Sequence, residues 1–297
     1  MDSDIKRVSL FIGLTYLFSW AIVFIFLAFG GSWNSPYTII ILITFMFVPS
    51  IIAIILQKMV CKEPLKEPLG ISFRPNRYFL VAWLLPPAIA LATVGISLLL
   101  PGIEYTPGLE GMVERFRSTL TTAQLVELQR QIVNSPIHPF WIALLQSLIA
   151  GPSINAIAGF GEELGWRGFL QKELSKFNFW KSSIIIGVVW GVWHAPIILQ
   201  GHNYPQHPSV GVIMMIIFTM LLSPIFSYVR IKAKSVIAAA IIHGSLNATI
   251  GLAIMPIRGG NDLTIGVTGL SGFIVLIIIN LIIYNRVHEI KLENNSP

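Results

Sequence analysis

The sequence has little charge and almost no cysteine. Only 11% of its 297 residues are Asp, Glu, Lys or Arg, against about a quarter in an ordinary soluble domain. The single cysteine, Cys61, excludes an internal disulfide and a cysteine-based metal site. Hydrophobic residues reach 54% and the mean hydropathy is +0.74. A soluble fold of this length could not bury so much apolar surface, so the sequence predicts an all-α membrane protein.

Long apolar runs occupy most of the chain. A spanning helix needs about 20 mostly apolar residues, and candidate runs cover roughly 8–29, 36–57, 78–100, 138–176, 182–200, 209–229, 235–256 and 264–285. They predict one integral membrane domain over 1–297, a polytopic bundle of about eight transmembrane helices. We expect Gly151-Pro152 to break or kink the fourth run, giving a partly inserted helix followed by a full span. Two separate helices there would make nine.

The basic residues favour one side of the membrane. Loops that would face one side contain most of the 20 Lys and Arg residues, and only Arg115, Arg117, Arg130 and Arg258 fall on the other side. Because cytoplasmic loops collect positive charge, we expect both termini inside a multi-pass protein of the cell membrane. The net charge of +6 thus needs no nucleic-acid partner. The loop over 101–137 would lie outside, with a short amphipathic helix between Leu109 and Val133, at the membrane interface or simply on the surface.

A few ionisable or polar residues lie deep in the predicted spans. Glu162, Glu163 and Arg167 lie on the fourth span, His194 on the fifth, and His243 and Asn247 on the seventh. At 1.5 Å rise per residue, they fall about 14–20 Å from the cytoplasmic helix ends. Such residues are costly in hydrocarbon and are functional by default, so three helices bringing them to one level predicts a site.

Helical spacing suggests how these side chains face. Glu163 and Arg167 are four residues apart and can pair, whereas Glu162 is rotated by about 100° and would lack that partner. Two carboxylates and one guanidinium leave one Glu free to act as a base. Trp190 and His194 repeat the spacing of four, so the indole could wall the pocket. His243 and Asn247 also share a face.

At these residues the chain resembles the CPBP family, the CAAX-protease and bacteriocin-processing intramembrane glutamate endopeptidases, which include the Rce1-like and Abi proteins. The two glutamates followed by arginine match Glu162-Glu163-xxx-Arg167. The aromatic-xxx-His motif appears as Trp190-xxx-His194, with Trp where Phe is usual, and His-xxx-Asn appears as His243-xxx-Asn247. The likeness covers roughly 140–250, and we expect a catalytic core at about 138–255.

The resemblance implies an intramembrane endopeptidase that needs no cofactor. By family likeness, Glu162 and His194 hold and activate a water, His243 and Asn247 stabilise the oxyanion, and Glu163 is a second carboxylate fixed by Arg167. The residues themselves fit this scheme, because hydrolysis needs a base, donors for the developing oxyanion and a proton for the leaving amine. The site is expected to open towards the cytoplasm.

Other interpretations of the same residues stay open. The glutamates with Arg167 could form a structural ion-pair network, and the histidines with Asn247 could be polar contacts between helices. A zinc-dependent metalloprotease is the main alternative, and the chain could also be a bacteriocin self-immunity or scaffold protein without activity. A secondary transporter is disfavoured because only one helix break is predicted. The candidate zinc ligands would be Glu162, Glu163, His194 and His243, and the histidines expected to be solvated or interfacial are His138, His202, His207 and His288.

The substrate is expected to be a peptide or a prenylated protein C-terminus presented at the lipid bilayer. The family resemblance covers both the removal of prenylated C-terminal tripeptides and bacteriocin processing. The sequence itself ends Asn294-Asn295-Ser296-Pro297, which carries no prenylation signal of its own. Sequence alone therefore leaves the choice between these substrates open.

Overall fold

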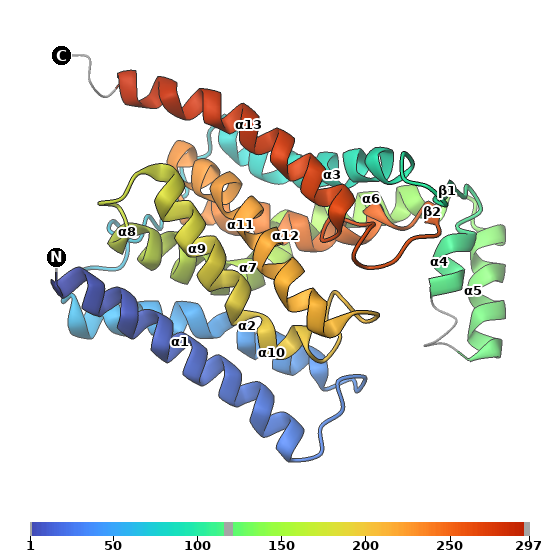
Figure 1. Cartoon of the computed structure of the whole chain (residues 1–297), viewed down its shortest axis with the longest axis horizontal. Helices are drawn as coiled ribbons and strands as arrows, with labels where there is room; N and C mark the ends of the chain where they lie inside the picture. The colour runs from blue at the N-terminus through green and yellow to red at the C-terminus, as the bar shows by residue number, and fades with distance from the viewer. Residues whose placement is uncertain (1, 116–120, 294–297) are drawn as a thin grey trace.

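The structure, a computed structural model, describes residues 2–115 and 121–293 as an elongated bundle of helices (Figure 1). Its α-helices in chain order are α1 (Asp2–Ala28), α2 (Thr38–Ile55), α3 (Arg77–Ser97), α4 (Glu110–Arg115), α5 (Thr122–Asn134), α6 (Pro139–Ala150), α7 (Ala156–Glu163), α8 (Gln171–Glu173), α9 (Phe179–Trp193), α10 (Ala195–Ile198), α11 (Pro208–Ala233), α12 (Val236–Thr249) and α13 (Leu270–Glu293). Shorter π-helical segments cover Leu56–Val60, Gly151–Asn155 and Leu164–Leu170, and a 3₁₀ turn covers Ile250–Ala253.

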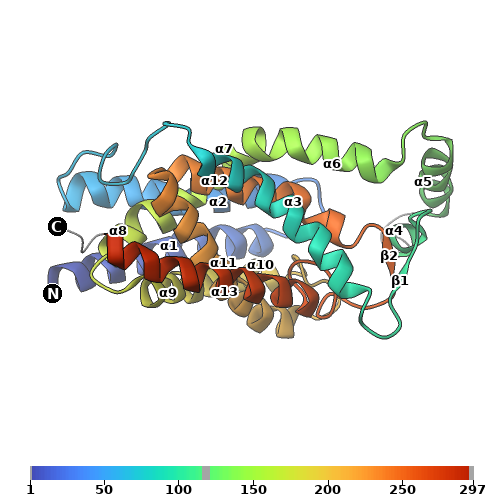
Figure 2. The same ribbon diagram turned by 90° about the horizontal axis from the view of Figure 1, so that it is seen from above.

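Seven helical segments of the described part are long and apolar enough to cross a membrane. The chain is therefore a multi-pass, all-α membrane protein, as the composition predicts. Figures 1 and 2 show that α1 begins and α13 ends at the same end of the bundle. The spans are Asp4–Ala28, Thr38–Val60, Arg77–Ser97, Pro139–Glu173, Pro208–Ala233, Val236–Ala253 and Leu270–Val287.

The span predicted over 182–200 is divided and shorter than expected. Helix α9 has 15 residues and α10 only four, so neither reaches the length of about 20 residues that a span needs. Pro196 is the second residue of α10, and without an N–H it cannot bond back into the preceding turn. The helix therefore breaks at His194, which places this side chain at a helix end.

At Gly151-Pro152, where the sequence predicts a break or a kink, the helix does not break and passes through a π-helical turn. α6, α7, α8 and the π-helical segments between them form one apolar helix, Pro139–Glu173, of 35 residues. A π-helical turn over Gly151–Asn155 absorbs the missing N–H of Pro152, because its wider i→i+5 bonding inserts an extra residue. The nine-span alternative therefore falls away.

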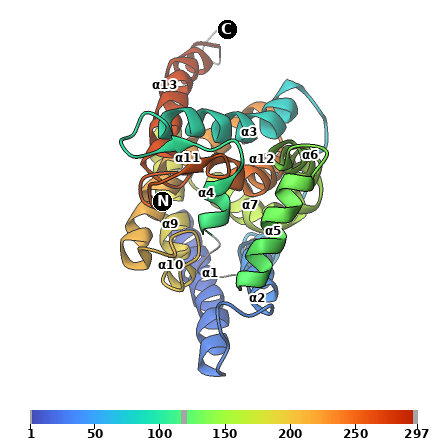
Figure 3. The ribbon, with the colours of Figure 1, turned by 90° about the vertical axis from the view of Figure 1, so that its right-hand side faces the viewer.

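Two short helices and a two-stranded ribbon project from the far end of the bundle. β1 (Glu104–Tyr105) pairs with β2 (Ile257–Arg258), with Glu104 opposite Arg258. α4 and α5 lie side by side (Figure 3) and next to this ribbon (Figure 1). The single helix predicted over 109–133 is thus replaced by two, and residues 116–120 lie outside the described residues. No residue of α5 is buried.

Glycines bring α7 and α12 into backbone contact. A Cβ added to Gly244 would lie 2.4 Å from both Ala156 N and Gly151 O, and one added to Gly159 would lie 2.9 Å from Ala240 O. Small residues allow this close approach between membrane helices. The contact places the glutamates at the end of α7 opposite His243 on α12.

Candidate active site

Glu162 and Glu163 end α7, and Arg167 lies in the π-helical segment that follows. All three side chains are inside the protein, with 2%, 0% and 1% of their surface exposed. Buried carboxylates need partners, because an unpaired charge away from water is very costly. The structure supplies a different set of partners to each glutamate.

The carboxylate of Glu163 is bound by a guanidinium and an imidazole. Nη1 of Arg167 lies 3.3 Å from Oε1 and 3.2 Å from Oε2 of Glu163, which confirms the predicted i,i+4 pair. Nδ1–H of His243 donates to Oε1 of the same carboxylate at 2.8 Å. The Arg167 guanidinium also lies 4.5 Å from the Trp190 ring centroid and 5.0 Å from that of Phe226, where cation–π attraction replaces water.

Glu162 is bound by indoles rather than by arginine. Nε1–H of Trp190 donates to Oε2 at 2.7 Å, and Nε1–H of Trp166 lies 3.4 Å from the same oxygen. Oε1 accepts no hydrogen bond from any described residue and lies 3.8 Å from Nε2 of His243. One oxygen is therefore anchored while the other faces an imidazole across a gap.

His194 contacts the backbone and the ring of Trp190. Its Nδ1 lies 2.8 Å from the Trp190 carbonyl oxygen, and because a carbonyl only accepts, Nδ1 must carry the hydrogen. Nε2 of the neutral ring then keeps its lone pair. The His194 ring lies 5.9 Å from the Trp190 ring and 4.7 Å from the Trp193 ring. Within the described part of the chain, no hydrogen bond or ion pair joins His194 to Glu162.

Asn247 lies outside the buried cluster. It follows His243 by one turn of α12, but its side chain is exposed and makes no hydrogen bond with any described residue. The cluster itself joins Glu162, Glu163, Arg167, Trp190 and His243. His194 adjoins it through Trp190, and Asn247 lies at its outer edge.

Two features of the cluster were not predicted from the sequence. The role of Trp166 as a donor to Glu162 was missed, and Trp190 was expected only to wall the pocket. The sequence did contain a signal for this role. An indole N–H can only donate a hydrogen bond, and a buried one usually finds an acceptor. Trp166 and Glu162 are also four residues apart, a spacing that brings side chains together on a helix.

The four candidate zinc ligands are not arranged around a common point as metal ligands would be. Among the described residues, no group of three or more His, Cys, Asp or Glu side chains is placed to hold a metal ion. Oε1 of Glu163 is occupied by the Nδ1–H of His243 and by Arg167. Nδ1 of His243 and the Glu163 carboxylate, two of the candidate ligand groups, are therefore bonded to each other.

The other histidines are placed apart from the cluster. His138 caps α6, with Nδ1 accepting from Phe140 N–H at 3.2 Å and Nε2–H donating to Pro107 O at 2.6 Å. His207 pairs with Asp262 at 2.6 Å. His202 packs edge-on against Trp33, and burial lowers its pKa. His288 lies outside the residues whose side chains are described.

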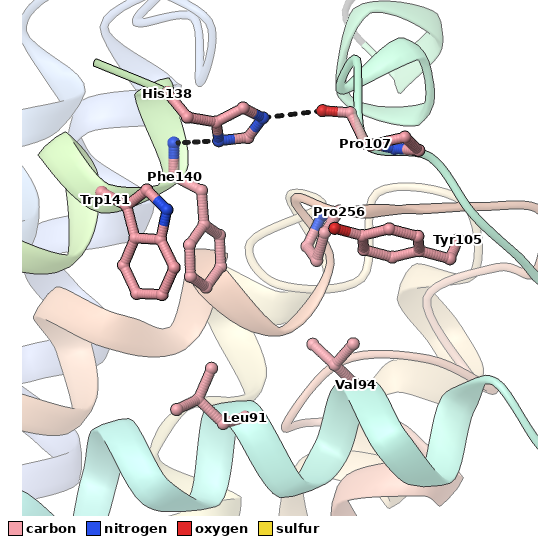
Figure 4. A pocket seen from close by; sticks show the side chains of 8 residues that line it. All are labelled: Leu91, Val94, Tyr105, Pro107, His138, Phe140, Trp141 and Pro256. Carbon is pink, nitrogen blue, oxygen red and sulfur yellow. Dashed lines mark hydrogen bonds between the residues drawn. The ribbon is translucent and has the colours of Figure 1, made fainter.

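A cavity of about 400 Å³ lies at the far end of the bundle (Figure 4). It is separated from Glu162 by about 33 Å of the helix that begins at α6, so it is distinct from the ionisable cluster. His138 borders it with both ring nitrogens already bonded. The lining residues are Leu91, Val94, Tyr105, Pro107, His138, Phe140, Trp141 and Pro256.

The segment that carries the cluster matches known proteins. Residues 136–249 match the family model described as type II CAAX prenyl endopeptidase Rce1-like. The chain is also similar to the CAAX prenyl protease 2 of Methanococcus maripaludis, with 32% identity over 97 residues. That alignment covers 31% of this chain and 36% of the archaeal protein, so the chain matches about a third of its relative's length. Every residue of the cluster lies inside the matched family segment.

Proposed function

We propose, from the match of residues 136–249 to the Rce1-like model of type II CAAX prenyl endopeptidases, that the chain is an intramembrane endopeptidase that trims prenylated protein C-termini. The observation that supports this most is the state of Glu162. Its carboxylate is buried and anchored through Oε2, while Oε1 accepts no hydrogen bond from the described residues. That is the arrangement a base needs in order to take a proton from water.

Glu162 and His194 share the water in this proposal. Oε1 of Glu162 removes one proton while the lone pair on Nε2 of His194 orients the water for attack on the scissile carbonyl. No hydrogen bond or ion pair joins the two described side chains, so in this proposal the water bridges them. Glu162 then returns the proton to the leaving amine, so that no serine or cysteine nucleophile takes part.

His243 and Asn247 stabilise the oxyanion. Nδ1–H of His243 is fixed by Glu163, so protonation places the second hydrogen on Nε2, 3.8 Å from Oε1 of Glu162, where an oxyanion formed beside that carboxylate can accept it. Protonation of His243 also balances the charge of the cluster, because two carboxylates otherwise face a single guanidinium. Asn247 adds an amide donor once the substrate fills the space beside α12. Loss of one such donor typically costs about 10²–10³-fold in rate.

The site acts without a metal and opens to the cytoplasmic half of a cell membrane. Arg167 and the Nδ1–H of His243 occupy the Glu163 carboxylate, and the Trp190 indole occupies Oε2 of Glu162, which supports a reaction without a metal. The loops at the end of the bundle nearest the cluster carry Lys and Arg residues, and such loops are typical of the cytoplasmic side. Prenylated C-termini would reach the site from that side with their lipid in the bilayer.

The test is a cleavage assay on the purified protein in lipid vesicles. A farnesylated peptide ending in a CAAX sequence and its unprenylated twin are incubated with the protein, and released tripeptide is measured by mass spectrometry. We expect cleavage of the lipidated peptide, and a loss of at least about 10²-fold in Glu162→Gln because the base is gone. Glu67→Gln, on an exposed loop residue, is the matched control and should keep full activity.

Three results would contradict parts of this proposal. Full activity of Glu162→Gln would remove Glu162 from its role. One tightly bound zinc per chain, with inactivation by a chelator, would favour the metalloprotease. No cleavage of either peptide by a well-folded protein would favour the immunity or scaffold role.

A further inference from the structure

Arg230 lies one helical turn from the wall of the site. It follows Phe226 by four residues on α11 and therefore shares its face. The Phe226 ring lies 5.8 Å from the His243 ring, and the Arg167 guanidinium lies 5.0 Å from its centroid. Arg230 is thus about 6 Å from the wall of the cluster along the helix axis, towards the basic end of α11.

The guanidinium of Arg230 is held against the site helix. Its Nη2–H donates to Leu69 O at 3.4 Å, and Leu69 O also lies 3.4 Å from the position of a Cβ on Gly168, the residue after Arg167. Gly70 leaves room for it, since an added Cβ would lie 1.8 Å from Nη2. The side chain therefore lies in a gap between α11, the loop before α3 and the helix of the glutamates.

Arg230 has no counter-charge among the described side chains. Its Nε is buried without a hydrogen-bond partner, and no carboxylate lies within ion-pair distance. Other cations near this end of the bundle are paired, Arg7 with Glu173 and Lys172 with Glu63. A partly buried guanidinium without an anion is costly, so the position calls for an anion from outside the described chain.

We propose that Arg230 binds the terminal carboxylate of the peptide substrate. This inference rests on the proposed function and names the substrate class more closely, as peptides with a free C-terminus near the scissile bond. Three extended residues reach about 10 Å, so a carboxylate three residues beyond a scissile bond at the cluster can reach past its wall, one helical turn of about 6 Å along α11, towards the Arg230 guanidinium. A guanidinium also suits a carboxylate, because its planar donors can bind both oxygens.

The decisive probe is the C-terminus of the peptide itself. A farnesylated peptide ending in a free carboxylate is compared with the same peptide ending in an amide. For the unmodified protein we expect the amide to raise KM by about 10–100-fold, the usual worth of a charged hydrogen-bonded pair, with kcat changed little. In Arg230→Gln, the KM for the carboxylate peptide should rise to that for the amide peptide, and the KM for the amide peptide should not change. Arg230→Lys should keep part of the preference.

Arg74→Gln is the matched control, because Arg74 is an exposed cation of the loop that also contains Leu69. It should keep the full preference for the carboxylate. If Arg230 only held the loop through Leu69 O, Arg230→Gln would raise the KM for both peptides by the same factor. This result would overturn the proposal. Equal handling of both peptides by the unmodified protein would overturn it as well.

A binding measurement separates this inference from the proposed catalysis. Glu162→Gln is placed in vesicles of zwitterionic lipid, and the dissociation constants of both peptides are measured by fluorescence, so that no cleavage is required. A carboxylate preference that disappears in Glu162→Gln/Arg230→Gln supports Arg230 as the carboxylate site even if the protein proves inactive as an enzyme. Equal affinities for the two peptides would reject the inference. Affinities that change only when anionic lipid is added would also reject it and would assign Arg230 to lipid phosphates.

Discussion

At the scale of single residues, Trp190 links the parts of the cluster. Its indole N–H donates to Glu162, its carbonyl oxygen accepts from His194, and its ring lies beneath the Arg167 guanidinium. One residue thus fixes the proposed base and the cation that holds Glu163 through its side chain, and the tautomer of the second imidazole through its backbone carbonyl. The related family usually has Phe at this position, so the hydrogen bond to Glu162 is a feature of this chain.

The substitution Trp190→Phe removes the indole N–H and keeps an aromatic ring at this position. The aromatic surface and the backbone bond to His194 remain, whereas Glu162 keeps only the longer bond from Trp166. Because a hydrogen bond to a charged group contributes about 1.5–3 kcal/mol, we expect kcat to fall by roughly 10-fold or more while the protein stays folded. The measurement is kcat with the farnesylated peptide, together with thermal unfolding. Trp180→Phe, far from the cluster along α9, is the control and should leave kcat unchanged. An unchanged kcat in Trp190→Phe would show that Trp166 alone positions the carboxylate.

The sequence predicts the members of the cluster better than their bonds. Helical rise alone brings Glu162, Glu163 and His243 to one depth, and the i,i+4 rule predicts the pair with Arg167. Neither rule says which of two glutamates an imidazole from another helix will contact, because that depends on the rotation of α12 about its axis. The rotation of α12 also explains why Asn247 is exposed. Helical spacing puts His243 and Asn247 on one face, but only His243 is covered by α7.

At the scale of elements, the contact between α7 and α12 determines the site. Gly244 has no side chain to keep the two backbones apart, and its neighbour His243 reaches Glu163 at 2.8 Å as a result. The contact is tight on both sides, with Ala156 N and Gly151 O each 2.4 Å from the Cβ position. A methyl group there has to move one backbone away from the other.

Gly244→Ala should therefore damage both stability and activity. Overpacking typically costs about 1–3 kcal/mol, and a displacement of about 1 Å can cost about 10²-fold in rate. We expect a lower unfolding temperature and a loss of at least about 10-fold in kcat. Gly95→Ala in α3 is the matched control, because nothing lies within 4 Å of its Cβ position, and it should leave both measurements nearly unchanged. Normal activity in Gly244→Ala would mean that α12 can shift without moving His243.

Prolines explain where the element boundaries could and could not be predicted. Pro152 and Pro196 each interrupt an apolar run, yet the first is absorbed in a π-helical turn and the second separates α9 from α10. The difference depends on what surrounds each turn. Gly151 packs against Ser245 of α12, which supports the wide turn, and a single sequence does not reveal such a neighbour. Helix existence was therefore predictable from hydropathy, whereas continuity through a proline was not.

At the scale of the whole molecule, the distribution of charge predicts how the bundle is oriented in the membrane. The beginning of α1 and the end of α13 lie together (Figures 1 and 2), and the loops at this end contain Lys66, Arg74 and Lys176. The opposite end carries the ribbon, α4 and α5. Because cytoplasmic loops collect Lys and Arg, we expect the first end to face the cytoplasm and α5 to lie outside.

Cysteine labelling tests this orientation. Burial raises the pKa of the Cys61 thiol, which slows its reaction with maleimides, and Cys61→Ser removes it altogether. In that background Lys66→Cys and Gln129→Cys each place one exposed thiol, the first before α3 and the second on α5. A membrane-impermeant maleimide added to intact cells should label Gln129→Cys alone, and Lys66→Cys should react only after the membrane is opened. Labelling in the reverse order would place the basic loops outside, and prenylated substrates in the cytoplasm would then have no direct path to Glu162.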